Sequence, residues 1–226
     1  MEKRIGAAAA KAVGLTSEDV ARLTGLYDQR LAEHGFDVRT VGWGTKSDQQ
    51  MRFDVLCRGL DLRGKRVLDL GCGLGDFVSY AEAKYGGDFS YCGMDISEKL
   101  ITAARQRFDG PQRDFIVGTL APHSDIGEFD VTLLSGTLTF KVTDNIATMK
   151  NVLTSAWNRS TEAVCCNFMT AYADFTLDKN FHYAPEEVFA FSKTLTRFVS
   201  LYHDYDLWEF TIQLHRRPTL KRTENI

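Results

Sequence analysis

The stretch "VLDLGCGLGDF", residues 67–77, joins a short apolar run to a turn that has glycine at three alternate positions. These glycines are Gly71, Gly73 and Gly75, and an acidic residue, Asp69, lies two positions before the first of them. Glycine allows a tight turn and lets a ligand come close to the backbone. Because the turn after the first strand of an open α/β sheet usually forms the floor of a ligand site, the stretch predicts a strand, a binding loop and a helix in that order.

From Lys65 onward, short apolar runs alternate with stretches of helical periodicity. We expect strands in "RVLDLG", "SYCGMDI", "RDFIVGTL", "FDVTLLSG" and "EAVCCNFMT", with helices between most of them, one of which Ser97 caps. Such alternation is typical of a doubly wound, mostly parallel sheet in the α/β class. After a helix that begins at Pro185, "RFVSLYHDYDLWEFTIQLHRR" predicts two strands joined by a turn, so we expect a C-terminal antiparallel hairpin.

The chain before the first strand is predicted to be helical. "LTSEDVARLTGLYDQRLAEHG" predicts one amphipathic helix that is capped by Thr16 or Ser17 and closes on Gly35. A Gly-Trp-Gly-Thr loop follows, and then a second helix with its N-cap at Ser47 or Asp48. We therefore expect residues 1–60 to form an N-terminal helical lid, residues 61–217 a single α/β domain, and residues 218–226 a tail.

Composition narrows the classes of function. The chain has 226 residues, 44% of them hydrophobic, which is enough to bury one sizeable core. Its net charge of −3 argues against nucleic acid as a partner. The five cysteines are odd in number and form no C-x-x-C pair, so we expect neither a disulfide framework nor a metal site. No apolar run approaches the roughly 18 residues of a membrane span, and no signal-peptide pattern opens the chain; we expect a cytoplasmic protein without membrane contact.

The acidic residues around the glycines indicate the charge of the ligand. Asp95 closes the second predicted strand, 20 residues after Gly75, where a carboxylate can accept hydrogen bonds from a ribose; this leaves both NAD and S-adenosylmethionine (SAM) open. Asp76, however, takes the place of the third glycine of the dinucleotide pattern G-x-G-x-x-G. An anionic pyrophosphate would be repelled by Asp69 and Asp76, whereas the sulfonium and ammonium groups of SAM would be attracted. We therefore expect a nucleoside with a cationic amino-acid tail.

These motifs, together with "YCGMDIS", "FIVGTL" and "FDVTLLSG", resemble the successive motifs of the Rossmann-like (class I) SAM-dependent methyltransferases over roughly residues 64–170. The resemblance implies a seven-stranded sheet with the order 3-2-1-4-5-7-6, SAM as cofactor and S-adenosylhomocysteine as product. Two departures are Thr119, where many members have an aspartate, and "NRSTEA" before the fifth strand, where a glycine pair is common.

The resemblance also assigns cofactor contacts by position. It places Asp69, Gly71, Cys72, Gly73 and Asp76 around the methionine part, Asp95 and Ile96 at the ribose and adenine edge, Thr119 and Leu120 at the adenine, and Ser135 and Gly136 at the pocket mouth.

The upstream segment "VGWGTKSDQQMRF" suggests a cover for the methionine end of the cofactor. In that reading Trp43 folds over the cofactor and Gln50 or Arg52 reaches its carboxylate, because arginine suits bidentate carboxylate contacts. The alternative is a tryptophan packed as a hydrophobic anchor and an arginine at the surface.

The sequence says less about the acceptor of the methyl group. Alignment of the reactants provides much of the catalysis in this reaction, and a catalytic base is optional. Aromatic and polar residues in "NFMTAYADFTLDKNFHYAPEE" favour an oxygen or nitrogen of a small-molecule metabolite over protein or RNA. His182, with Tyr183 beside it, is the candidate catalytic base, the alternative being a surface histidine.

Two other classes of function stay open from the sequence. One is an NAD(P)-dependent Rossmann reductase, and the other is a non-catalytic SAM-binding regulatory or partner protein. The sequence gives no prediction of oligomeric state.

Overall fold

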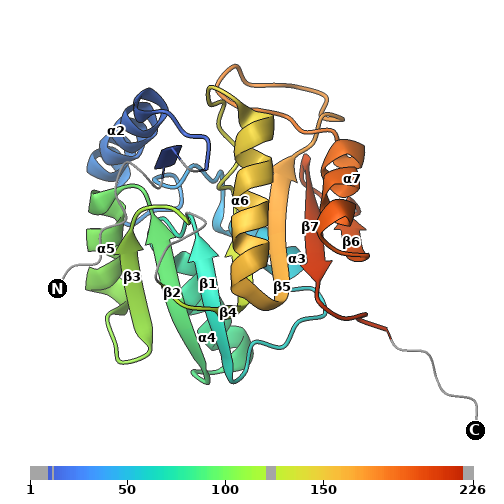
Figure 1. The fold of residues 1–226 in the computed structure, drawn as a ribbon. Helices are drawn as coiled ribbons and strands as arrows, with labels where there is room; N and C mark the ends of the chain where they lie inside the picture. Colours follow the sequence, from blue (N-terminus) through green and yellow to red (C-terminus); the bar gives the residue numbers. More distant parts are fainter. Residues whose placement is uncertain (1–9, 12, 121–125, 221–226) are drawn as a thin grey trace, which may run out of the picture.

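A mixed seven-stranded sheet forms the centre of the computed structural model, which describes residues 10–11, 13–120 and 126–220 (Figure 1). The strands are β1 Lys65–Leu70, β2 Phe89–Asp95, β3 Arg113–Val117, β4 Phe129–Leu134, β5 Ser160–Met169, β6 Phe198–Tyr202 and β7 Glu209–His215. Their order is β3-β2-β1-β4-β5-β7-β6, and β7 runs antiparallel to both of its neighbours. The predicted fold class, strand order and C-terminal hairpin are therefore confirmed.

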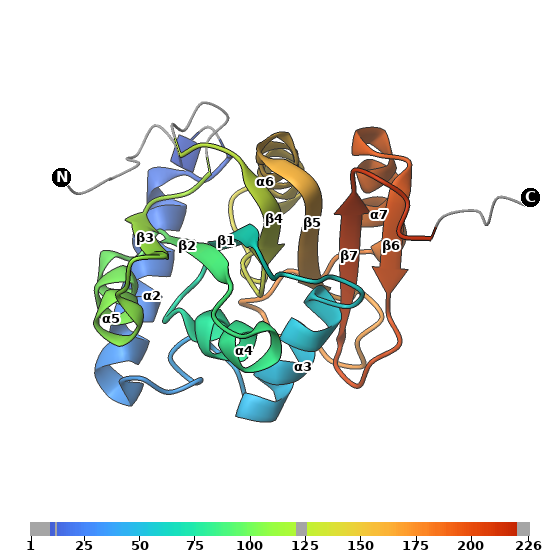
Figure 2. The same cartoon turned by 90° about the horizontal axis from the view of Figure 1, so that it is seen from below.

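Helices cover both faces of the sheet. They are α2 Ser17–His34, α3 Lys46–Leu56, α4 Asp76–Tyr85, α5 Glu98–Phe108, α6 Asn145–Arg159 and α7 Pro185–Leu195. The view from below shows α6 and α7 on one face and α3 and α4 on the other (Figure 2). Each face has its own apolar cluster, and Leu68 and Val67, neighbours in β1, belong to different clusters. Because both faces are buried, the central strands read as continuous apolar runs rather than alternating ones.

The first N-terminal helix begins as predicted. Thr16 is the N-cap of α2: its hydroxyl accepts from the amide of Asp19, and the Asp19 carboxylate accepts from the amide of Thr16, which completes a capping box. The start of α3 differs from the prediction. Thr45, and neither Ser47 nor Asp48, is its N-cap, because the amide of Asp48 donates to Thr45 Oγ1 at 3.1 Å.

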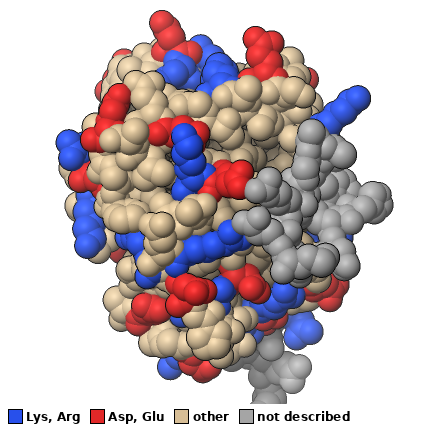
Figure 3. Space-filling model, turned by 90° about the vertical axis from the view of Figure 1, so that its left-hand side faces the viewer, with Lys and Arg blue, Asp and Glu red and all other residues tan. Residues whose placement is uncertain are grey.

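One end of the sheet is covered by α2, which lies against α5 (Figures 1 and 2). Lys99 of α5 forms an ion pair with Asp28 of α2 at 2.9 Å, and the hydroxyl of Ser97 donates to the same carboxylate at 3.2 Å. Where this side of the molecule is not covered by grey atoms, Lys and Arg side chains are interspersed with Asp and Glu side chains (Figure 3). An ion pair and a hydrogen bond to Asp28 thus connect α2 to the start of α5.

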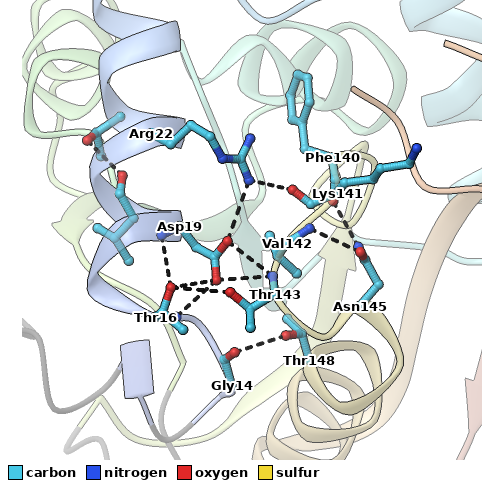
Figure 4. A network of polar contacts seen from close by, with 12 residues as sticks. Gly14, Thr16, Asp19, Arg22, Phe140, Lys141, Val142, Thr143, Asn145 and Thr148 are labelled. Atoms are coloured by element: carbon cyan, nitrogen blue, oxygen red, sulfur yellow. Dashed lines mark hydrogen bonds and ion pairs between the residues drawn. The ribbon is translucent and has the colours of Figure 1, made fainter. Parts of the chain in front are cut away.

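A buried carboxylate, Asp19, ties α2 to the loop that follows β4 (Figure 4). The amide of Thr143 donates to its two oxygens at 3.1 and 3.2 Å, and the hydroxyl of Thr16 donates to Oδ2 at 2.8 Å. Arg22 lies 3.5 Å from Oδ1 and also donates to the carbonyl of Lys141. Burial by itself raises the pKa of Asp19, but the hydrogen bonds from Thr143 and Thr16 outweigh it and lower that pKa to about 2.

The predicted boundaries of the lid and tail remain an interpretation. Of the predicted lid, residues 1–9 and 12 lie outside the described residues, as do residues 221–226 of the predicted tail. None of the helices in the described ranges combines the length and apolarity that crossing a membrane requires. All five cysteines are buried free thiols, and no three His, Cys, Asp or Glu side chains gather to hold a metal ion within the described part of the chain.

We expect Asp19→Ala to lower the free energy of unfolding by about 2 kcal/mol at pH 7, because the hydrogen bonds that three donors make to a buried carboxylate are lost. The folded-state pKa lies below the ordinary value, so this stabilisation is present above about pH 4 and is lost as the pH falls toward 2. Urea unfolding at pH 7 and pH 3 measures both effects. Glu18→Ala, which removes an exposed neighbouring carboxylate, is the control. If Asp19→Ala lowered the free energy of unfolding no more than Glu18→Ala does, the stabilising contact between Asp19 and the loop after β4 would be contradicted.

Candidate functional site

A cavity lies at the carboxyl ends of β1, β2 and β4, where the strand order reverses. We call it the glycine-loop cavity, because residues 71–73 form part of its wall. Its lining includes these residues predicted from the sequence: Trp43, Asp69, Gly71, Cys72, Gly73, Asp76, Asp95, Ile96, Thr119, Ser135 and Gly136. Segments far apart in the sequence thus meet at the place where an open α/β sheet binds its ligands.

The loop after β1 requires glycine for two separate reasons. Gly71 and Gly73 have φ values of +80° and +54°, a region that side chains disfavour. A Cβ atom at Gly71 would also lie 2.5 Å from the hydroxyl of Thr137, and one at Gly73 would lie 2.6 Å from a methyl group of Val41. The bare loop therefore lets the wall of the cavity close around whatever it holds.

Asp95 connects the end of β2 to this loop. Its Oδ2 accepts a hydrogen bond from the amide of Gly73 at 3.0 Å, and its Oδ1 accepts one from the amide of Ser97 at 2.9 Å. Burial raises the pKa of Asp95, while the amides of Ser97, Gly73 and Ile96 act in the opposite direction. The carboxylate thus lines the cavity in a fixed orientation, held by backbone groups.

Asp69 is a buried carboxylate that titrates near neutral pH. Its pKa is raised to about 7, chiefly by burial. The hydroxyl of Tyr91, which donates to Oδ2 at 2.8 Å, acts to lower this pKa, and the charges of Asp95 and Asp76 act to raise it. A cationic group placed beside Asp69 would favour the ionised form. Asp76, the third carboxylate, pairs with Arg107 at 2.7 Å.

The segment before the sheet forms the outer wall of the cavity. Trp43 covers Gly136, where a Cβ atom would lie 2.2 Å from the indole ring. Leu23 and Tyr27 of α2 and Gln49 of α3 also line the cavity. Sequence reasoning did not select these three, although Leu23 and Tyr27 share one face of the predicted helix. The position of this segment supports the interpretation of a lid.

Two predicted cofactor residues lie elsewhere. Leu120 is fully buried in an apolar cluster and does not line the cavity. Arg52 is only 8% exposed and binds Glu209: Nε lies 2.9 Å from both carboxylate oxygens, and Nη2 lies 2.5 Å from Oε1. The guanidinium also lies 4.1 Å from the ring centre of Trp43. Arg52 is therefore neither at the glycine loop nor at the surface, and Gln49, which donates to Asp76 at 3.1 Å, stands closer to the predicted place.

The two predicted catalytic residues are held in the packing beside the end of β5. Tyr183 is 1% exposed and packs edge-on against Phe168, with 4.9 Å between ring centres. Nδ1 of His182 donates to the carbonyl of Thr170 at 2.8 Å. Neither residue lines a cavity described here, because a bridge between Thr170 and Tyr183 draws this segment alongside the strand. These contacts hold both side chains in the packing, and their catalytic role stays a prediction.

A second cavity opens beside the first. The two cavities share Tyr27, Val41, Trp43, Gly136 and Phe140 as a common wall. Arg30 of α2 and Arg52 of α3 also line the second cavity. Further lining residues come from the connection between β5 and α7 and from the turn between β6 and β7, including Phe175, Lys179, Asn180, Tyr205 and Trp208. The sequence indicated the connection between β5 and α7 for acceptor binding, and residues of it line this cavity, although His182 and Tyr183 do not.

Comparison with known proteins agrees with the geometry. The profile of the family described as "Methyltransferase domain" matches residues 67–156. A Mycobacterium tuberculosis protein that carries the name methyltransferase Rv1506c is 30% identical over 158 residues, which are 66% of this chain and 92% of that protein.

Two solved structures show the same fold at low sequence identity. Magnesium protoporphyrin IX methyltransferase from Synechocystis PCC 6803 with bound S-adenosylhomocysteine has a TM-score of 0.63 and 16% identity, covering 87% of this chain and 99% of that one. Human N-acetylserotonin methyltransferase in complex with SAM has a TM-score of 0.65 and 15% identity, covering 94% and 62%.

The raised pKa of Asp69 leads to a pH-dependent binding prediction. We expect the affinity for S-adenosylhomocysteine to rise about tenfold between pH 6 and pH 8, because the ammonium group of that molecule favours an ionised carboxylate whose pKa is about 7. Titration calorimetry across this range measures it. Asp69→Asn should flatten the profile, and Tyr91→Phe, which removes a donor to the ionised form, should move it to higher pH. The same pH profile in Asp69→Asn and the unmodified protein would contradict this role.

Proposed function

Since this chain belongs to the Rossmann-like SAM-dependent methyltransferases, we propose that it transfers the methyl group of SAM to an oxygen or nitrogen atom of a small-molecule metabolite. One observation carries the proposal. The glycine-loop cavity presents three carboxylates, Asp69, Asp76 and Asp95, and its described lining contains no Lys, Arg or His. Such a wall suits a ligand that is positively charged and carries ribose hydroxyls.

The residues of the cavity fit the parts of SAM. Asp95 suits the ribose hydroxyls, and Asp69 suits the ammonium group. Ile96, Leu100 and Thr119 supply a mostly apolar surface for the adenine ring. When bound, SAM supplies a methyl group that the adjacent sulfonium makes electrophilic.

The work left to the protein is positioning. The acceptor lone pair must form a bond to the methyl carbon as the carbon–sulfur bond breaks, with the bonding electrons staying on sulfur and any proton of the acceptor leaving to solvent. Trp43 and Gly136 form the wall between the two cavities, so an acceptor in the second cavity would meet the methyl group there. In this proposal the enzyme aligns the reactants and uses neither His182 nor Tyr183 as a base.

The two rival functions fit the cavities less well. The pyrophosphate of an NAD(P)-dependent reductase would face the carboxylates of Asp69 and Asp76. A non-catalytic SAM-binding protein would have no use for a second cavity that shares a wall with the first. The adjoining cavity is also what favours a small-molecule acceptor.

We expect Asp95→Ala to weaken the binding of S-adenosylhomocysteine by about tenfold to a hundredfold, because charge-assisted hydrogen bonds to the ribose are lost. Titration calorimetry measures the affinity, and thermal unfolding checks that the variant is folded. Asp114→Ala, which removes an exposed carboxylate from the neighbouring strand β3, is the matched control and should bind normally. Unchanged affinity in Asp95→Ala, or stabilisation by NADH and not by S-adenosylhomocysteine, would exclude the proposed function.

A further inference from the structure

The second cavity holds two guanidinium groups that have donors to spare. Arg30 of α2 and Arg52 of α3 both line it, and the Nη1 atom of each is buried without a hydrogen-bond partner among the described residues. A buried donor that is left unpaired is costly to a folded protein. Two such donors in one cavity indicate that a ligand completes them.

The neighbours of Arg52 fix its orientation and leave its Nη1 atom without a hydrogen-bond partner. Nε and Nη2 of the guanidinium donate hydrogen bonds to Glu209. The guanidinium carbon lies 4.1 Å from the ring centre of Trp43. The side chain is nine-tenths buried, so it cannot swing out to reach solvent without breaking the ion pair. Its third nitrogen is thus a fixed, buried donor that no described residue satisfies.

Arg30 has no carboxylate partner among the described ion pairs. Its guanidinium carbon lies 5.9 and 5.6 Å from the ring centres of Tyr27 and Phe140, and its Nη1 atom lies 2.9 Å from where a Cβ atom of Gly42 would be. Gly42 precedes Trp43, on which Arg52 packs. Two guanidinium groups from two helices therefore flank the same short segment, the one that separates the two cavities.

The charges of the cavity favour a single negative charge on its ligand. Arg30, Arg52 and Lys179 are its described cationic side chains, and Asp206 and Glu209 are its described acidic ones, which leaves one positive charge in excess. Because a planar guanidinium matches a carboxylate in shape as well as in charge, a carboxylate fits this balance, whereas a phosphate monoester would carry more charge than the cavity offsets.

The remainder of the lining is aromatic and apolar. Tyr27, Trp43 and Phe140 form the common wall with the glycine-loop cavity. At the rim, Phe175 is 54% exposed and Trp208 is 42% exposed. Large apolar side chains left open beside a cavity are typical of a surface that a ligand covers.

We propose that the methyl acceptor of this enzyme is an aromatic or otherwise apolar small molecule that carries one carboxylate, and that Arg30 and Arg52 bind this carboxylate. The inference rests on the proposed function and adds the class of acceptor to it. The carboxylate fixes the orientation of the acceptor, and the apolar rim and common wall hold its body against the side of the cavity that faces SAM.

The test compares three probes that share one aromatic body: 1-naphthylacetate, its neutral analogue 1-naphthylacetamide, and 1-naphthyl phosphate. Binding to the full chain, saturated with S-adenosylhomocysteine, is measured by saturation-transfer NMR and by competition between probes. We expect the carboxylate to bind about tenfold or more tightly than the amide, and more tightly than the phosphate, because charge-assisted hydrogen bonds to guanidinium discriminate by this amount.

The deciding variant is Arg30→Gln, which leaves no carboxylate unpaired. It should reduce the preference for the carboxylate over the amide to about threefold or less, with the affinity for S-adenosylhomocysteine unchanged. Arg63→Gln, which removes an exposed arginine paired with Asp61, should keep the full preference. If Arg30→Gln is unstable, the double variant Arg52→Gln and Glu209→Gln removes a guanidinium together with its partner and should act in the same way.

The outcomes separate the inference from the function on which it rests. Equal binding of carboxylate and amide, tighter binding of the phosphate, a preference that survives Arg30→Gln, or no binding of any probe at millimolar concentration would overturn the inference while S-adenosylhomocysteine still binds. Failure of S-adenosylhomocysteine to bind the unmodified protein would overturn the proposed function itself.

Discussion

The hydrogen bond from the amide of Gly73 to the carboxylate of Asp95 is the contact on which the site depends. It joins the loop after β1 to the end of β2, and the same carboxylate accepts from Ser97, the N-cap of α5. One acidic side chain therefore sets the positions of a strand end, a loop and a helix start. With Asp69 and Asp76 on the same wall, this arrangement concentrates negative charge in a buried space, which a cationic ligand relieves.

Contacts at the same cavity also position α2, α3 and the segment between them. Val41 covers Gly73 and Trp43 covers Gly136, so the segment between α2 and α3 closes the cavity only because glycine stands at both positions. Asp19 fastens α2 to the loop after β4, and Glu209 fastens Arg52 of α3 to the start of β7. The wall between the two cavities is thus held from both sides, which suits a reaction that depends on alignment more than on acid–base chemistry.

The sequence predicted the sheet and the glycine-loop cavity well for a common physical reason. Strands buried on both faces read as apolar runs, and in an open α/β sheet the residues after those strands must meet at one edge. It did not indicate contacts that the fold makes between separate parts of the chain. Nothing near Arg52 indicates Glu209, which is 157 residues distant, and nothing near Tyr183 indicates its bridge to Thr170 at the end of β5. Periodicity and spacing report neighbours along the chain, and these two residues are placed by contacts across the fold.

The central claim is that the carboxylates of the glycine-loop cavity select a nucleoside with a cationic amino-acid tail. The most direct measurement is titration calorimetry at pH 8 with S-adenosylhomocysteine and with 5′-methylthioadenosine, which has the same thioether nucleoside without that tail. The account predicts that S-adenosylhomocysteine binds about tenfold to a hundredfold more tightly, because the contact of its ammonium group with a carboxylate of the cavity is worth about 1.5 to 3 kcal/mol. Affinities within about threefold of each other would contradict it.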